Sequence, residues 1–91
     1  MKMSFDPAKD ARNLLERGLS FARVADFEWA SAVIVADTRQ DYGEPRFQAL
    51  GFIDSRLHML VFTPRHGGVH IISLRRANAR EVRAYETQSQ S

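Results

Sequence analysis

The chain has 91 residues, of which 44% are hydrophobic; this length suffices for one domain with one core and is too short for two. It contains no cysteine, which excludes disulfide bonds, thiolate metal sites and a cysteine nucleophile. Apolar runs such as 59–62 are too short to cross a bilayer, and the first ten residues lack the apolar stretch of a secretion signal. We therefore expect a cytoplasmic protein that does not contact membranes.

The net charge is only +2, but the charges are unevenly placed. Residues 1–45 contain six basic and eight acidic residues, whereas residues 46–91 contain seven basic and three acidic ones. Most of the basic residues are arginines, whose guanidinium groups bind phosphates and carboxylates bidentately. The bias suggests either a phosphate polyanion or an acidic protein partner, although a solvated charged surface accounts for most charge surpluses of this kind taken singly.

The first predicted element is a helix over residues 7–17. Asp6 can cap its N-terminus, Pro7 suits its first position, and Gly18 can end it in a left-handed conformation. Its apolar side chains fall within an arc of about 120°, so we expect them to form a buried face. These residues are Ala8, Ala11, Leu14 and Leu15.

Residues 20–28 are predicted to form a second, shorter helix, which completes a helical hairpin. After it, β-branched and aromatic residues predict four strands in an antiparallel meander. The strands are expected at 33–35, 46–53, 56–63 and 69–76. Asp54 and Ser55 fit a tight two-residue turn, and residues 64–68 fit a longer loop.

These turn lengths determine which side chains share a face of the sheet. A two-residue turn places alternate residues of the second and third strands on one face. This face would carry Arg46, Gln48, Leu50, Phe52, Leu57, Met59, Val61 and Thr63. A five-residue loop would add Arg75 to this face and turn Arg76 to the other, so the two arginines would have different surroundings.

The last predicted element is a helix that starts after Asn78. Asn78 and Glu81 form a variant of the capping box, and Ala79, Val82 and Tyr85 form an apolar stripe. Beyond it we expect a short disordered tail.

The predicted fold class is therefore α+β: two N-terminal helices packed on a four-stranded antiparallel sheet, followed by a C-terminal helix. Residues 1–87 would form the single domain and residues 88–91 the tail.

Arginines cluster around the junction between the last strand and the last helix. Arg80 and Arg83 lie about 60° apart on the helix, and together with Arg65, Arg75 and Arg76 they could line one basic edge. Such an edge would follow a phosphate backbone, with an attraction that weakens steeply as salt is added. On the pattern alone, ordinary surface arginines paired with Glu81 and Glu86 are favoured over a binding edge.

The three histidines, His58, His66 and His70, show no metal-binding spacing, and we expect no metal site. His66 lies in a glycine-flanked loop and is the best placed of the three for proton transfer. The other two are expected to pack or to hydrogen-bond locally, and Trp29 is expected to anchor the core.

Three segments in combination resemble the BrnT toxin family, the ribonuclease half of a bacterial type II toxin-antitoxin pair. They are FDPAKDARNLLERGLSF, DYGEPRFQALG and IISLRRANAREVRAYE, and they span nearly the whole chain in the family's order. The resemblance implies a RelE-like fold and RNA cleavage without a metal or another cofactor. It also implies a BrnA-like antitoxin with a ribbon-helix-helix part, through which operator DNA would be bound.

The reaction implied by the resemblance is attack of a ribose 2′-hydroxyl on the adjacent phosphate, whose added negative charge guanidinium groups can stabilise. Arg46, Arg75, Arg76 and Arg80 match basic positions of the family pattern, while Arg65 follows only from its loop position and analogy. Tyr85 could stack on a base, assist proton transfer or simply pack. The catalytic candidates are thus Arg65, Arg75, Arg76 and Tyr85, and the RNA-binding candidates are Arg46, Arg80, Arg83 and His66.

The sequence departs from the family pattern at two places. Glu16 and Arg17 stand where family members commonly carry a lysine-histidine pair, and Leu74 stands where a small residue is common. Glu16 reverses a charge, so activity or partner specificity could differ. A binding module that docks its antitoxin or nucleic acid without cleaving RNA is therefore an alternative, whereas a plain DNA-binding domain lacks any visible motif.

Overall fold

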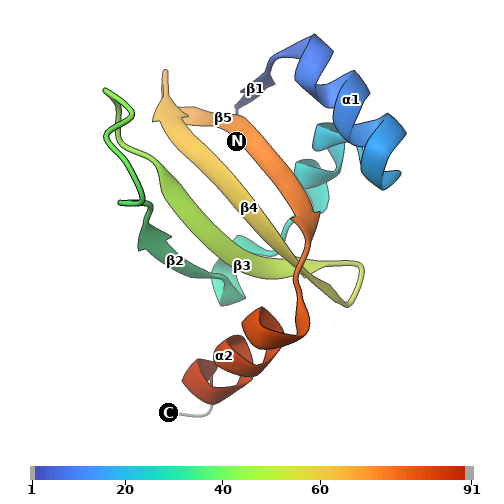
Figure 1. The fold of residues 1–91 in the computed structure, drawn as a ribbon, viewed down its shortest axis with the longest axis vertical. Coiled ribbons are helices and arrows are strands. Elements are labelled where there is room, and N and C mark those ends of the chain that lie inside the picture. Colours follow the sequence, from blue (N-terminus) through green and yellow to red (C-terminus); the bar gives the residue numbers. More distant parts are fainter. Residues whose placement is uncertain (1, 90–91) are drawn as a thin grey trace.

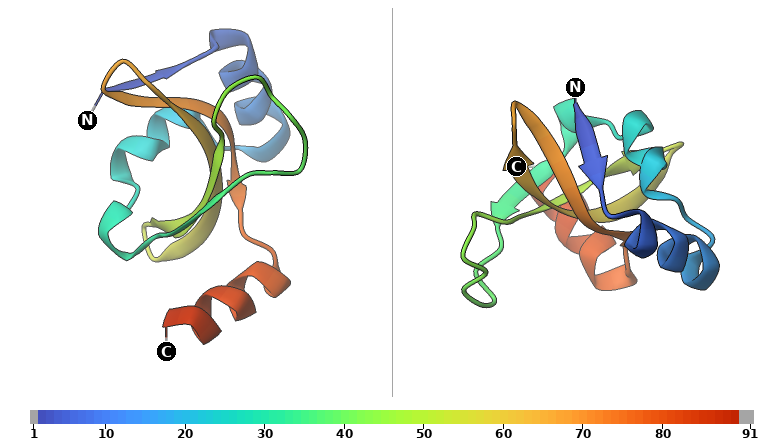
Figure 2. Two further views of the ribbon diagram at one scale, coloured as in Figure 1. Left: turned by 90° about the vertical axis from the view of Figure 1, so that its left-hand side faces the viewer. Right: turned by 90° about the horizontal axis from the view of Figure 1, so that it is seen from above.

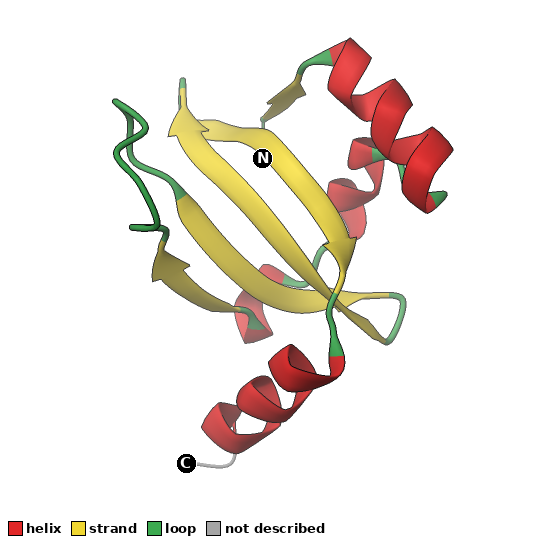
Figure 3. Ribbon diagram, viewed as in Figure 1, coloured by secondary structure: helices red, strands yellow, loops and turns green. Residues whose placement is uncertain are grey.

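The computed structural model describes residues 2–89, which form an α+β fold with a five-stranded mixed sheet (Figure 1). The strands are β1 (Met3–Phe5), β2 (Val33–Ala36), β3 (Phe47–Ile53), β4 (Arg56–Arg65) and β5 (Gly68–Arg76). The helices are α1 (Pro7–Arg17), α2 (Ala79–Ser89) and the short 3-10 helices η1 (Phe21–Asp26) and η2 (Trp29–Ser31). The strand order across the sheet is β1-β5-β4-β3-β2, as Figure 3 shows in yellow.

The predicted α+β class and the antiparallel meander of β2 to β5 are confirmed, but the prediction of a purely antiparallel four-stranded sheet is wrong. A fifth strand, β1, pairs parallel to β5, with Met3 opposite Val69 and Phe5 opposite Ile71. A three-residue strand is too short to show the alternation that identifies strands in a sequence. Its addition makes the sheet mixed and covers one of its edges.

The helix α1 has the caps that its sequence indicates. The Asp6 carboxylate accepts a hydrogen bond from the Ala8 N–H at 2.9 Å, and Gly18 has a φ of 65° while its N–H donates to the Leu14 carbonyl. The prediction of a second N-terminal α-helix is wrong, because the segment forms the 3-10 helix η1 instead, and a further 3-10 helix, η2, follows it. The Ser20 hydroxyl caps η1 by accepting a hydrogen bond from the Ala22 N–H.

The apolar stripe of α1 is not buried, contrary to prediction. Leu14 is 52% exposed and Leu15 is 87% exposed, whereas Asn13 is buried. The Asn13 amide donates to the carbonyls of Leu19 at 2.8 Å and Leu74 at 2.9 Å. A buried carbonyl without a donor is costly, so these bonds turn the polar side chain inward and leave the apolar stripe outside.

The turn between β3 and β4 has the predicted two residues. Asp54 and Ser55 have φ values of 51° and 71°, as in a type I′ hairpin turn, and Ile53 pairs with Arg56 across it. Directly opposite residues share a face, so the predicted facing of β3 and β4 is confirmed.

The loop between β4 and β5 is shorter than predicted. The strands extend to Arg65 and Gly68 around a two-residue turn, and not around a five-residue loop. A bulge next to Val61 and Phe62 adds one residue to β5 and thereby restores the predicted facing. Arg75 therefore lies opposite Met59 and Arg76 opposite His58, so the two arginines lie on opposite faces, as predicted.

The two faces of the sheet have different surroundings. One face, here called the core face, packs against η1 through its buried residues Ala49, Ile53, Leu60 and Leu74. The opposite face, here called the α2 face, includes Gln48, Phe52, Met59, Ser73 and Arg75. In the left view of Figure 2 the 3-10 helices and the 37–46 loop lie on opposite sides of the sheet.

Within residues 2–89, no helix combines the length and the apolar character needed to cross a membrane.

Candidate functional site

A small polar hollow lies on the α2 face of the sheet, where α2 begins. It has a volume of about 120 Å³ and is called the arginine hollow here. Its lining comes from the 37–46 loop, three strands and α2, and comprises Arg39, Gln48, Met59, Val61, Ser73, Arg75 and Glu81.

Arg75 is held in the hollow by a bidentate ion pair. Its two Nη atoms donate to the two carboxylate oxygens of Glu81, each at 2.8 Å, and Nη1 also donates to the Arg76 carbonyl at 3.3 Å. These bonds raise the pKa of Arg75 and lower the pKa of Glu81, so both groups are charged at neutral pH. Because a guanidinium carries five N–H groups, two of them stay available for a ligand.

The same glutamate caps α2. Its carboxylate accepts from the Asn78 N–H at 2.9 Å, and its own N–H donates to the Asn78 side chain at 2.8 Å. The predicted capping box is therefore present. Since one carboxylate both caps the helix and binds Arg75, the start of α2 fixes where the guanidinium lies.

A second bidentate pair, between Arg39 and Asp37, was missed by the sequence analysis. Arg39 donates from Nε and Nη2 to the Asp37 carboxylate at 2.8 and 2.7 Å, and the Tyr42 hydroxyl donates to the same carboxylate at 3.3 Å. The Asp37 side chain is fully buried although Arg39 is largely exposed. An Asp-x-Arg spacing in a polar loop has no periodic signal, so only the folded loop shows that Arg39 reaches the hollow.

The ion pair between Asp37 and Arg39 should make the stability of the fold depend on pH. Hydrogen bonds from Arg39 lower the pKa of Asp37 from 3.8 to about 2, so the pair stabilises the fold above the unfolded-state pKa and loses this effect as the pH falls through about 2. Asp37→Asn should be less stable than the parent at neutral pH, and this difference should shrink between about pH 4 and pH 2. Urea unfolding midpoints measured across that range test this; a difference that stays constant would contradict it.

Arg46 and Arg65 are brought together by Glu44. Arg46 lies over the Tyr42 ring, 4.0 Å from its centroid, and the Glu44 carboxylate pairs with Arg46 and with Arg65, each at 3.3 Å. Arg65 lies opposite Gly68, seven residues along β5 from Arg75, a separation of about 23 Å at 3.3 Å per residue. The structure therefore does not bring all five predicted arginines to one edge.

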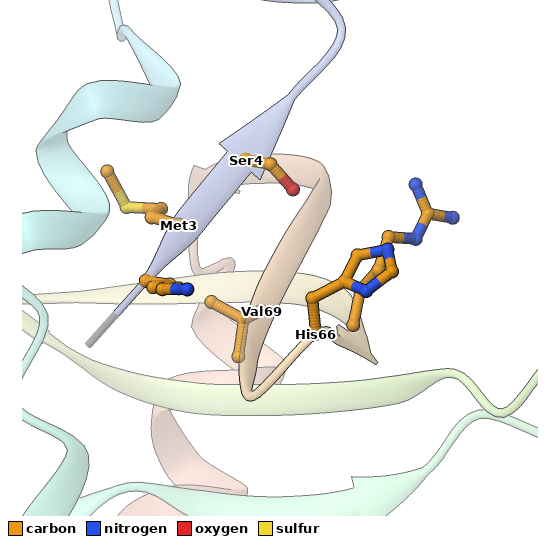
Figure 4. A pocket seen from close by; sticks show the side chains of 6 residues that line it. Met3, Ser4, His66 and Val69 are labelled. Atoms are coloured by element: carbon orange, nitrogen blue, oxygen red, sulfur yellow. The ribbon is translucent and has the colours of Figure 1, made fainter.

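His66 lies at the tip of the β4–β5 hairpin with a φ of 51°. It lines a pocket of about 400 Å³ between this tip and β1; Figure 4 shows His66 and Ser4 on either side of it. The pocket is separate from the arginine hollow, with which it shares no lining residue. Within the described residues, no group of three or more histidine, aspartate or glutamate side chains is placed to hold a metal ion.

The candidates on α2 have unlike environments. Tyr85 is buried, its hydroxyl donates to the Ser31 carbonyl at 2.8 Å, and its ring packs edge-on against Phe52. These contacts correspond to the packing role among the three alternatives for Tyr85. Arg80 and Arg83 are exposed on the helix surface.

Arg76 is exposed and points away from the hollow, into a cleft at the end of the core face.

The two arginines of the hollow are positioned by carboxylates over an accessible sheet face. This arrangement is typical of a protein that binds an anionic ligand.

Comparison with known proteins identifies the family to which the chain belongs. A family model described as "Ribonuclease toxin, BrnT, of type II toxin-antitoxin system" matches residues 5–81. The chain therefore belongs to the BrnT family of ribonuclease toxins, as its sequence pattern predicts. A search of curated proteins found no match.

Proposed function

We propose that the protein is an endoribonuclease toxin that cleaves RNA without a metal ion and that the arginine hollow holds the phosphate that is attacked. The proposed activity rests on the family match over residues 5–81. The location is supported by the charged Arg75–Glu81 pair in the hollow.

In the proposed reaction the ribose 2′-oxygen forms a bond to phosphorus and the bond from phosphorus to the 5′-oxygen breaks. The products are a 2′,3′-cyclic phosphate and a free 5′-hydroxyl. The negative charge added in the transition state would be stabilised by the unused N–H groups of Arg75 and Arg39, which need no rearrangement because their carboxylate partners already hold them. Glu81 is ionised, as a group that accepts the 2′-hydroxyl proton must be, and water would protonate the leaving oxygen.

Membership of a type II toxin-antitoxin family implies an antitoxin partner and an RNA substrate. We propose that the partner is a BrnA-like protein with a ribbon-helix-helix part and that the pair binds operator DNA through that part. The protein would act in the cytoplasm, where its substrate and its antitoxin are made.

A second candidate function is antitoxin or nucleic-acid binding without cleavage. It is favoured by one observation: both arginines of the hollow are already bound bidentately by carboxylates. A ligand would then use only the remaining N–H groups, which suffice for binding. Cleavage requires in addition that Glu81 accept a proton while still paired with Arg75.

Incubating the purified protein with a defined single-stranded RNA, with EDTA present, separates the two functions. We expect fragments with 2′,3′-cyclic phosphate and 5′-hydroxyl ends, and no change in rate when Mg²⁺ replaces EDTA. Intact RNA that is nevertheless bound would favour the second function. Fragments that form only with Mg²⁺, or that carry 3′-hydroxyl ends, would overturn the proposed reaction.

A further inference from the structure

A second basic cleft lies on the opposite side of the sheet from the arginine hollow. It has a volume of about 320 Å³ and is formed where the β3–β4 turn meets the end of α1 and the end of β5. We call it the Arg76 cleft; the residues that matter for its chemistry are Arg17, Arg23, Asp54, Arg56, His58 and Arg76.

The fold brings these side chains together from distant parts of the sequence. Arg17 is the last residue of α1, Arg56 is the first residue of β4, and Arg76 is the last residue of β5. Gly51, His58 and Arg76 lie side by side across β3, β4 and β5. Because Asn13 ties α1 to the Leu74 carbonyl, the end of the helix is held beside the end of β5.

The cleft holds more positive charge than its own carboxylate balances. Arg23 is paired with Asp26 and Asp54, which accounts for the carboxylate of the cleft. Among residues 2–89, the side chains of Arg17, Arg56 and Arg76 form no ion pair. Three unpaired guanidinium groups around one polar cleft repel one another, and an anion bound between them would relieve that repulsion.

His58 gives the cleft a hydrogen-bond acceptor as well. Its Nδ1 lies 2.7 Å from the Arg56 carbonyl; a carbonyl only accepts, so Nδ1 carries the proton, and in the neutral ring Nε2 has the lone pair. Burial and the charges of Arg76, Arg23 and Arg56 lower the pKa of His58, which keeps the ring neutral. Nε2 of the buried imidazole can therefore accept a hydrogen bond, whereas the arginines around it can only donate.

We infer that the Arg76 cleft binds one nucleotide of an RNA strand, with the arginines contacting a phosphate and His58 accepting a hydrogen bond from the adjacent ribose 2′-hydroxyl. Donors for a phosphate next to an acceptor for a hydroxyl match the chemistry that distinguishes RNA from DNA. The inference extends the proposed function by adding a second RNA contact on the other face of the sheet. The inference rests on the proposed function only for the assumption that the bound polymer is RNA.

Adenosine 3′-monophosphate tests the inference without depending on cleavage, because it has a 2′-hydroxyl beside a phosphate and no phosphodiester to cut. Titrating it into the isotope-labelled full chain should produce saturable NMR shifts of the His58 ring. The 2′-deoxy form should bind about fivefold more weakly, because it lacks one neutral hydrogen bond. Equal affinity for the two ligands, or no shift of His58, would overturn the inference.

Charge-matched variants locate the ligand. Arg56→Ala and Arg76→Ala should each weaken binding about tenfold, as expected for the loss of a charged hydrogen bond. Arg12→Ala removes the same charge from α1 outside the cleft and should leave the affinity unchanged. If Arg75→Ala abolishes binding while Arg56→Ala has no effect, the ligand lies in the arginine hollow and the inference is wrong.

Discussion

Replacing Arg75 with alanine is expected to slow RNA cleavage by about 10²- to 10³-fold, the usual effect of removing a preorganised donor from a developing negative charge. Arg75 is the guanidinium of the hollow that Glu81 and the start of α2 hold in place. Its loss removes both the phosphate contact and the hydrogen bonds that lower the pKa of Glu81. Initial rates of the purified variant on a defined RNA measure the effect, and expression of the variant should no longer arrest growth.

The fold should survive this substitution, because the Arg75 side chain is about one-third exposed and Glu81 keeps its bonds to Asn78. Arg75→Lys retains the charge but loses the bidentate pair, so its rate should lie between those of the parent and the alanine variant. Arg12→Ala provides a variant with the same loss of charge outside the hollow. Cleavage by Arg75→Ala at the parent rate would show that the phosphate is held elsewhere.

Most of the successful predictions of the fold depended on short sequence patterns of a few adjacent residues. The caps of α1, the capping box of α2 and the turn at Asp54 and Ser55 each depend on a few adjacent residues. The sequence also predicted that Arg75 and Arg76 lie on opposite faces of the sheet, but the prediction assumed a five-residue loop between β4 and β5, which is wrong. The β4–β5 turn is two residues long, and the unforeseen bulge compensates for the difference.

Features that depend on distant contacts were not predictable from periodicity. The apolar stripe of α1 indicated the wrong buried face, because two hydrogen bonds of Asn13 to distant carbonyls decide how the helix is turned. The Arg76 cleft was missed for a related reason. Its guanidinium groups come from α1, η1, β4 and β5, so no spacing in the sequence connects them. The arginine cluster apparent near residues 75–83 divides between two faces.

Gly51 lies in β3 against the ring of Phe27, and adding one methyl group at this position should destabilise the fold. A Cβ at this position would lie 2.9 Å from both Cε atoms of the Phe27 ring, closer than packed carbon atoms come. Phe27 is buried, and its ring packs edge-on against Trp29, which in turn packs against Phe62. Because the ring is buried and packed against Trp29, Gly51→Ala should cost about 1–3 kcal/mol of unfolding free energy.

For a domain of this size, such a loss should lower the thermal midpoint by about 4–8 °C per kcal/mol, which calorimetry can measure. A smaller side chain at the contact should relieve the clash, so the same substitution should cost less in a Phe27→Leu background. A double-mutant cycle measures this coupling directly. Additive effects of the two substitutions would show that the Phe27 ring is not what excludes a side chain at Gly51. Since Gly51 lies beside His58 on the neighbouring strand, the clash should also shift the NMR signals of the His58 ring, which connects packing at the core to the Arg76 cleft.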